Sequence, residues 1–352
     1  MKQKIKVLII DDSALAREII ATGLGNDQSI EVVGTASDVY VARDKIIKLK
    51  PDVLTLDIEM PGMDGIEFLQ KLMPQYPIPV VVVSSLSQRG KQITKQAIEA
   101  GAVDFIAKPS SNLQRGLADM LIELRTKIKL ASTANVAYWK GKKSGLISNN
   151  FQKSTALAES TDKIIAIGAS TGGTEAIKRI LSELPVNMPG IVIVQHMPPK
   201  FTKMFAESLN ANCSMEVKEG ETDDRVMPGR VLVAPGNFQT KLIRSGGIYK
   251  IVCQEGDKVS GHCPSIDVFM NSVAMAAGKN AWGILLTGMG SDGAKGMKAM
   301  KDAGALNVAQ DEATSVVFGM PKVAYELGAV DKLLPLDKIS SFLITQVQKS
   351  IK

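Results

Sequence analysis

Residues 163–181 read KIIAIGASTGGTEAIKRIL, in which an apolar, β-branched run leads through a glycine-rich turn into an amphipathic segment. An apolar run of this kind is typical of a strand that is buried on both faces of a parallel sheet. The segment after the turn has the apolar spacing of a helix. Because the same strand-to-helix pattern recurs on both sides of this stretch, the predicted fold class is α/β.

The second half of the chain repeats the pattern, with further apolar runs at residues 190–196, 230–235, 281–288 and 305–310. The segment KLIRSGGIYKIV (residues 241–252) interrupts them and predicts a β-hairpin with its turn at Gly246 and Gly247. We therefore expect residues 162–352 to form one doubly wound parallel-sheet domain of the Rossmann-like kind.

The first half contains five shorter apolar runs separated by amphipathic segments, at residues 6–10, 30–36, 52–57, 78–84 and 103–107. Five such units predict a small doubly wound parallel sheet, flavodoxin-like in class, over residues 1–128. Residues 129–161 lack this pattern and are rich in Ser, Thr, Asn and Lys, which predicts a linker. Tyr138 and Trp139 in this linker either dock onto one of the domains or are surface aromatics.

Composition narrows the function class. The 352 residues are 45% hydrophobic and 22% charged, which fits two globular domains and excludes disordered and fibrous classes. The net charge of +6 comes from 42 Lys and Arg against 36 Asp and Glu spread along the chain, so no nucleic-acid partner is expected. No apolar run approaches the roughly 20 residues that a membrane span needs, so we expect no membrane insertion and a cytoplasmic location.

The cysteine and histidine content argues against zinc. Three cysteines without a C-x-x-C pair and only two histidines provide neither a disulfide framework nor an ordinary zinc site. A reducing compartment fits this usage.

Polar side chains follow several strands of the predicted first domain, where parallel sheets place their functional groups. These strand-end residues are Asp11, Asp12, Asp57, Ser84 and Lys108. Clustered carboxylates repel one another unless a cation neutralises them, and an oxygen-only site suits Mg²⁺. A phosphoryl group on Asp57 would be balanced by the cation and Lys108, with Ser84 as a hydrogen-bond donor. Any one of these aspartates alone would more often be a helix cap.

This first domain resembles the receiver domain of two-component response regulators, through LIIDDSALAR (8–17), LDIEMPGMDG (56–65), VVVVSSLS (80–87) and DFIAKPS (104–110). The resemblance implies that Asp57 is phosphorylated by a histidine kinase and that Ser84 and Lys108 sense the phosphate. It also implies a cis bond from Lys108 to Pro109. The remaining implied roles are a Mg²⁺ site made by Asp11, Asp12, Asp57 and the carbonyl of Glu59, and an aromatic switch at Phe105, which could equally be a plain core residue.

In the second domain, Ser170 lies at the glycine-rich turn, His196 ends the next strand, and Asp292 lies in the glycine-rich loop after a later strand. Serine, histidine and aspartate at neighbouring strand ends favour a nucleophile, a general base and a carboxylate that orients the base. Two alternatives remain for the turn: Ser170 caps the helix, or the glycines around it cradle a nucleotide phosphate.

The second domain resembles the catalytic domain of the protein-glutamate methylesterases of bacterial chemotaxis, through IGASTGG (167–173), VQHMPP (194–199), GHCPSIDVFM (261–270) and LLTGMGSDGAKGM (285–297). The resemblance implies a triad of Ser170, His196 and Asp292, an oxyanion site at the backbone of Met289, and Thr171 beside the nucleophile. His262 would serve substrate contact or packing.

The resulting hypothesis is a phosphorylation-regulated serine esterase that acts on glutamate methyl esters in the cytoplasmic helices of chemoreceptors, with no cofactor in the catalytic domain. Glutamine deamidation stays open, because the same chemistry attacks a primary amide. The alternative is a non-catalytic response regulator whose second domain binds a nucleotide.

Overall fold

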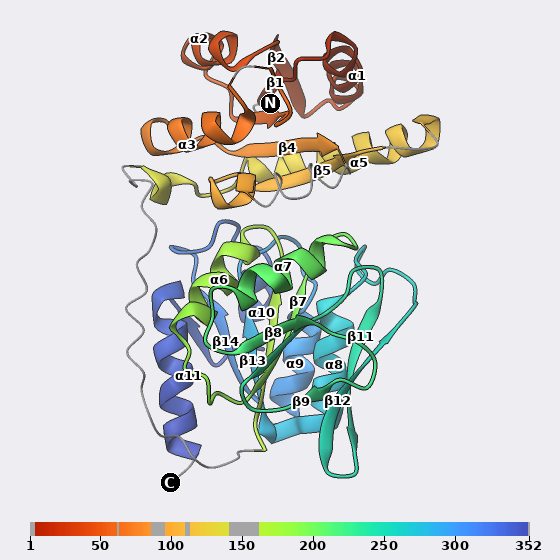
Figure 1. Cartoon of the computed structure of the whole chain (residues 1–352), viewed down its shortest axis with the longest axis vertical. Coiled ribbons are helices and arrows are strands. Elements are labelled where there is room, and N and C mark those ends of the chain that lie inside the picture. The colour runs from red at the N-terminus through yellow and green to blue at the C-terminus, as the bar shows by residue number, and fades with distance from the viewer. Residues whose placement is uncertain (1–3, 62, 86–95, 110–112, 141–161, 351–352) are drawn as a thin grey trace. The chain divides into compact units, whose positions relative to one another are not determined.

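The computed structural model of the chain describes residues 4–61, 63–85, 96–109, 113–140 and 162–350. The chain separates into two compact units, residues 1–148 and 149–352 (Figure 1). Each unit is built around a parallel sheet, which confirms the predicted α/β class.

The first unit contains a five-stranded sheet in the order β2-β1-β3-β4-β5, with all four neighbouring pairs parallel. Its strands are β1 (Ile5–Ile10), β2 (Ile30–Ala36), β3 (Val53–Leu56), β4 (Val80–Ser85) and β5 (Asp104–Lys108). Its labelled helices are α1 (Ala14–Gly25), α2 (Val39–Leu49), α3 (Gly65–Gln75) and α5 (Leu113–Ala131). The chain reverses its direction across the sheet between β1 and β3, so the carboxyl ends of these two strands meet at the switch point.

Helix α5 reaches into the predicted linker, and the residues after it remain packed on the first unit. Val136 is buried, and Trp139 of the short 3-10 helix η1 (Ala137–Trp139) lies so close to Gly101 that a Cβ there would come within 3.1 Å of its ring. Trp139 therefore docks onto the first unit. The side chain of Tyr138 and residues 141–161 lie outside the described part of the chain.

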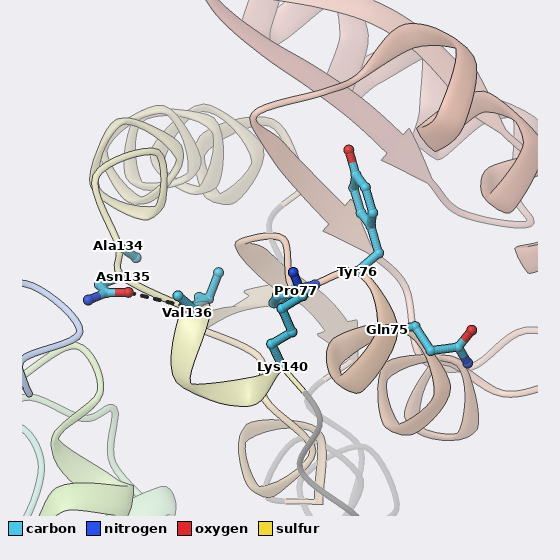
Figure 2. A pocket seen from close by; sticks show the side chains of 8 residues that line it. Gln75, Tyr76, Pro77, Ala134, Asn135, Val136 and Lys140 are labelled. Carbon is cyan, nitrogen blue, oxygen red and sulfur yellow. Dashed lines mark hydrogen bonds between the residues drawn. The ribbon is translucent and has the colours of Figure 1, made fainter.

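A pocket of about 470 Å³ lies where this segment meets the end of α3 (Figure 2). It is lined by Gln75, Tyr76 and Pro77, which follow one another at the end of α3, and by residues 134–137 and Lys140. Pro77 precedes β4, so the pocket is at the amino end of that strand, away from the strand ends that carry the acidic residues.

The second unit contains a seven-stranded parallel sheet in the order β15-β14-β13-β6-β7-β10-β8. Its strands are β6 (Ile164–Ala169), β7 (Gly190–Gln195), β8 (Glu216–Glu219), β10 (Arg230–Val233), β13 (Ala281–Leu285), β14 (Leu306–Gln310) and β15 (Lys332–Leu334). Its helices are α6 (Gly173–Glu183), α7 (Phe201–Asn210), α8 (Ile266–Ala277), α9 (Ala294–Asp302), α10 (Met320–Glu326) and α11 (Leu336–Ser350), with the 3-10 helix η2 (Gly278–Asn280).

Both faces of this sheet are covered, because alternate residues of each strand face opposite sides. Ile164 and Ala166 of β6 pack in one core with apolar residues of α8, α9 and α10. Ile165 and Ile167 pack in the other core with α6, α7 and α11. This two-sided burial is what the apolar runs in the sequence predicted.

The predicted hairpin is confirmed as β11 (Gln239–Ser245) and β12 (Ile248–Gln254), with Gly246 and Gly247 in left-handed conformations at the turn. The two-residue strand β9 (Arg225–Val226) completes this antiparallel sheet. The implied cis bond at Lys108–Pro109 is wrong: among the described residues, the cis peptide bond lies at Cys263–Pro264. Within the same residues, no helix is both long and apolar enough to cross a bilayer.

Candidate active site

Three neighbouring strands of the second unit bring the predicted catalytic residues to one edge of the sheet. Ser170 follows β6, His196 follows β7, and Asp292 lies in the loop between β13 and α9. The backbone N–H of His196 donates to the carbonyl of Ala169 at 3.1 Å, which keeps the ends of β6 and β7 in register. The switch point of this sheet lies between β6 and β13, where ligand sites of open α/β sheets are found.

The imidazole of His196 is joined to the carboxylate of Asp292. Nε2 of His196 lies 2.8 Å from Oδ2 of Asp292, and the side chains are only 7% and 2% exposed. Nδ1 of His196 is buried and has no hydrogen-bond partner among the described residues. A neutral ring that donates from Nε2 to Asp292 carries its lone pair on Nδ1, so Nδ1 is the nitrogen that can accept a proton.

The carboxylate of Asp292 is held by groups at the start of α8. Ser265 Oγ donates to Oδ1 at 2.8 Å, and the backbone N–H groups of Ile266 and Asp267 donate to Oδ2 and Oδ1 at 2.8 and 3.0 Å. Burial raises the pKa of Asp292, but the hydrogen bond from His196, its positive charge when protonated, and the donors at α8 lower it below its ordinary value. The carboxylate therefore stays ionised beside the histidine.

Ser170 lies at the turn between β6 and α6, partly exposed. Its N–H donates to the carbonyl of Thr287 at 3.0 Å, and its carbonyl accepts from Gly173 N and Gln195 Nε2 at 2.7 and 2.9 Å. The helix cap is Gly172 in a left-handed conformation, with no side-chain cap bond, so Ser170 does not serve as the cap of α6. Within the described residues, no hydrogen bond joins the Ser170 hydroxyl to the His196 ring.

The loop that carries Met289 is pressed against the turn that carries Ser170. A Cβ added to Gly288 would lie 2.7 Å from Cβ of Ser170, so only glycine allows this approach. The Gly288 carbonyl accepts from the N–H groups of Gly319 and Met320 at 3.1 and 2.8 Å, which fixes the loop from behind. Met289 itself is 39% exposed.

Thr287 ties the same two segments together and was missed at the sequence level. Its buried hydroxyl donates to the carbonyl of Thr171 at 2.9 Å and accepts from the N–H of Val317 at 2.9 Å. Gln195 and Ser265, which support Ser170 and Asp292, were missed as well. Only Ser265 carried a local signal, because a serine before an apolar helical run is an N-cap pattern.

The sequence left His262 between substrate contact and packing, and the structure places its ring flat against the ring of His196. The two ring centroids are 3.6 Å apart and the planes differ by 7°.

The first unit gathers the predicted acidic residues. Ligand atoms of Asp11, Asp12 and Asp57 all lie within 4.8 Å of one another. Nζ of Lys108 lies 2.9 Å from Oδ2 of Asp11 and 2.5 Å from Oδ2 of Asp57. Three carboxylates and no softer ligand form a donor set that fits Mg²⁺.

The surroundings of Asp57 contain a cation and a hydroxyl that suit additional negative charge on this side chain. Burial raises the pKa of Asp57, and the hydrogen bond and charge of Lys108 offset part of that effect. The hydroxyl of Ser84 is buried without a hydrogen-bond partner in the described part of the chain. Glu59 is exposed, and its N–H donates to Asp57 Oδ1 at 3.1 Å. Phe105 is buried on β5, with Nζ of Lys127 5.3 Å from its ring centroid.

Comparisons with known proteins match both units. Residues 165–343 match the family model described as CheB methylesterase, and residues 7–118 match the response regulator receiver domain. A protein-glutamate methylesterase/protein-glutamine glutaminase of Syntrophotalea carbinolica is 62% identical over 98% of both chains. Its namesake from Salmonella typhimurium is 47% identical over 98% of this chain and 97% of its own.

A solved structure gives the same result for the second unit. The catalytic domain of the Thermotoga maritima CheB methylesterase matches with a TM-score of 0.51 and 40% identity, over 52% of this chain and 98% of that chain.

Proposed function

Since this chain belongs to the CheB methylesterase family and carries a receiver domain in front of its catalytic domain, we propose that it demethylates chemoreceptors under the control of phosphorylation. The substrate would be a glutamate methyl ester on the cytoplasmic helices of a methylated receptor. The observation that carries the catalytic assignment is the buried pair of His196 and Asp292 at the strand end beside Ser170.

In the first step, the hydroxyl oxygen of Ser170 attacks the ester carbonyl carbon while Nδ1 of His196 takes the hydroxyl proton. Asp292 holds the ring through Nε2 and stabilises the imidazolium that forms. The negative charge that develops on the carbonyl oxygen would be met by the backbone N–H of Met289, with Thr171 beside the nucleophile.

In the second step, the tetrahedral intermediate collapses and His196 returns the proton to the leaving oxygen, so that methanol departs and an acyl-serine remains. Water then attacks the acyl group with His196 as the base, which releases the glutamate carboxylate and restores Ser170. With a glutamine side chain the leaving group would be ammonia, in line with the second activity in the names of the relatives.

The phosphoacceptor would be Asp57, with a chemotaxis histidine kinase as the donor. Asp11, Asp12, Asp57 and the carbonyl of Glu59 would hold Mg²⁺, which supplies positive charge where the carboxylates and a phosphoryl group gather. Lys108 already lies against Asp57, and the hydroxyl of Ser84, which has no hydrogen-bond partner among the described residues, would be available to a phosphoryl oxygen. Phe105 would be the aromatic that responds to the phosphate.

The assay that tests the catalytic proposal is methanol release from receptor membranes whose glutamates carry labelled methyl groups. Release that depends on this protein supports it, and a protein that binds nucleotide but releases no methanol would favour the non-catalytic alternative. Regulation is tested with a small-molecule phosphodonor and Mg²⁺, where acid-labile label should enter the wild-type chain and be absent from Asp57→Asn.

A further inference from the structure

The ring of His262 covers one face of the His196 ring, at 3.6 Å between centroids and 7° between planes. We propose that His262 is a positioning residue for the esterase reaction: its flat face holds the plane of the His196 imidazole, so that Nδ1 stays aligned with the nucleophile. This inference rests on the proposed function of Ser170 and His196, and it assigns a role that the sequence left open.

The ring of His196 needs such support because its single hydrogen bond to Asp292 does not fix the plane of the ring. His196 is anchored through Nε2 to Asp292 at 2.8 Å, and its ring can still turn about its side-chain bond and tilt about that contact. Either motion displaces Nδ1, which has no hydrogen-bond partner among the described residues. A parallel ring in van der Waals contact opposes both motions, since tilting would drive the two rings into each other.

The backbone of His262 is itself well anchored. Its N–H donates to the carbonyl of Val259 and its carbonyl accepts from the N–H of Val259, both at 3.0 Å. The buried side chain of Gln239 donates to the carbonyl of His262 at 3.4 Å and accepts from the N–H of Ser265 at 2.9 Å. A ring on such a base can act as a fixed wall.

The segment that carries His262 also contacts Asp292, the hydrogen-bond partner of His196. Three residues after His262, Ser265 begins the group of donors that binds Asp292. Residues 262–267 therefore contact both His196 and Asp292, so a movement of this segment would shift the base and its orienting carboxylate together.

Two substitutions of similar bulk distinguish the contribution of the flat ring of His262 from that of its nitrogen atoms. His262→Phe keeps an aromatic face and removes both nitrogens, whereas His262→Leu fills space without a ring. We expect the full chain with His262→Phe to keep kcat for methanol release within a few-fold of wild type. His262→Leu should lower kcat by about ten- to a hundred-fold, as misplaced catalytic groups do, with KM nearly unchanged.

A spectroscopic readout follows the ring directly, because the chain has only two histidines. Protein labelled with ¹⁵N-histidine and prepared without a histidine tag gives signals from His196 alone once His262 is replaced. The His262→Phe variant should show one neutral tautomer, protonated at Nε2 and unprotonated at Nδ1. The His262→Leu variant should show broadened signals, because its His196 ring moves between orientations.

Three results would overturn the proposal: wild-type kcat in His262→Leu, equal losses in both variants, or broadened His196 signals in His262→Phe. Thermal unfolding of each variant identifies one that does not fold. If His262→Leu does not fold, the spectrum and kcat of His262→Phe decide, and if His262→Phe does not fold, wild-type kcat in His262→Leu still overturns the proposal. Ser170→Ala in the same assay tests the proposed function separately, since residual methanol release there would refute the nucleophile whatever the His262 variants do.

Discussion

The His196 ring gives its outer nitrogen, Nε2, to the carboxylate of Asp292 and leaves Nδ1, the nitrogen nearer the backbone, for proton transfer. His196 therefore cannot exchange the roles of Nε2 and Nδ1 without losing its hydrogen bond to Asp292. The chemistry assigned to the site thus depends on a small number of atoms, and single substitutions test it.

Ser170→Ala should reduce kcat for methanol release on the order of 10⁴- to 10⁶-fold, because it removes the proposed nucleophile. Only one partly exposed hydroxyl is lost, so the thermal unfolding midpoint should stay close to wild type. His196→Ala should be nearly as severe, and the double variant about as slow as either single one, because the residues act as a unit.

The matched control is Ser182→Ala, which removes an exposed hydroxyl from α6 whose contact is with the carbonyl of Arg179. It should behave as wild type. A Ser170→Ala enzyme that retained most of its rate, or losses that multiplied in the double variant, would contradict the assignment.

Ser265→Ala should lower both activity and stability, because Asp292 loses a hydrogen bond from a buried hydroxyl. Hydrogen bonds to charged groups contribute about 1.5–3 kcal/mol, so the free energy of unfolding should fall by about that amount. Urea unfolding and methanol release measure the two effects.

Ser272→Ala is the control on the same helix, since its hydroxyl accepts from Leu242 N and donates to the carbonyl of Phe269, away from Asp292. It should affect stability without a comparable loss of kcat. If both variants lost kcat equally, the contact between Ser265 and Asp292 would not be what matters.

At the scale of elements, the glycine-rich loop after β13 is shaped to lie against the turn after β6. Gly288→Ala places a Cβ 2.7 Å from Cβ of Ser170, a contact that real structures essentially never show, so one of the two segments must move. Since that movement displaces either Ser170 or Met289, we expect kcat to fall by about a hundred-fold.

Gly25→Ala, at the end of α1, serves as the comparison for this substitution. Among the described residues, its added Cβ would have no neighbouring heavy atom within 4 Å. Kinetics of both variants decide the matter: near-normal kcat in Gly288→Ala would show that the loop can shift without harm to the site.

Much of this architecture was predictable because the signal was local. Long apolar runs gave β6, β7 and β13 to within a few residues, and Gly246 and Gly247 gave the hairpin turn. Strands β8 (EVKE) and β15 (KLL) were missed, since three or four residues at a sheet edge carry too little apolar pattern.

In the candidate site, too, features with a local sequence signal were predictable and long-range contacts were not. The placement of Ser170, His196 and Asp292 at neighbouring strand ends was predictable because each follows a recognisable strand. The contacts of Ser265 with Asp292, of Thr287 with Thr171 and of His262 with His196 join residues 27, 116 and 66 positions apart, which no local pattern reports. Such contacts arise only when the strands pack in their final order.

At the scale of the whole molecule, we expect the unphosphorylated receiver to restrain the catalytic domain, so that removing it raises the basal rate of methanol release. A restrained state favoured by about 1.4 kcal/mol would make the full chain about tenfold slower than the free domain. The catalytic domain of the Thermotoga maritima relative was crystallised by itself, which supports a separable domain.

The truncation should start near residue 141, because Val136 and Trp139 pack on the receiver and would be left uncovered in a fragment that starts at residue 129. Phosphorylation of the full chain should bring its rate up to that of the fragment or above it. A fragment no faster than the unphosphorylated full chain would rule out restraint and leave direct activation or substrate recruitment.

The candidate site draws its residues from strands that are far apart in the sequence, and this determines when the site can form during synthesis. Ser170 and His196 leave the ribosome first, but Asp292 is 96 residues further along than His196, beyond the hairpin. In a nascent chain, the proposed nucleophile and base are thus present before the carboxylate that would orient them, so we expect efficient ester hydrolysis only once the second half of the sheet is in place. The turn at Gly246 and Gly247 lies between His196 and Asp292 in the sequence, so a chain divided there gives one fragment with Ser170 and His196 and another with Asp292. Ester hydrolysis by a mixture of the two fragments would show that they have assembled.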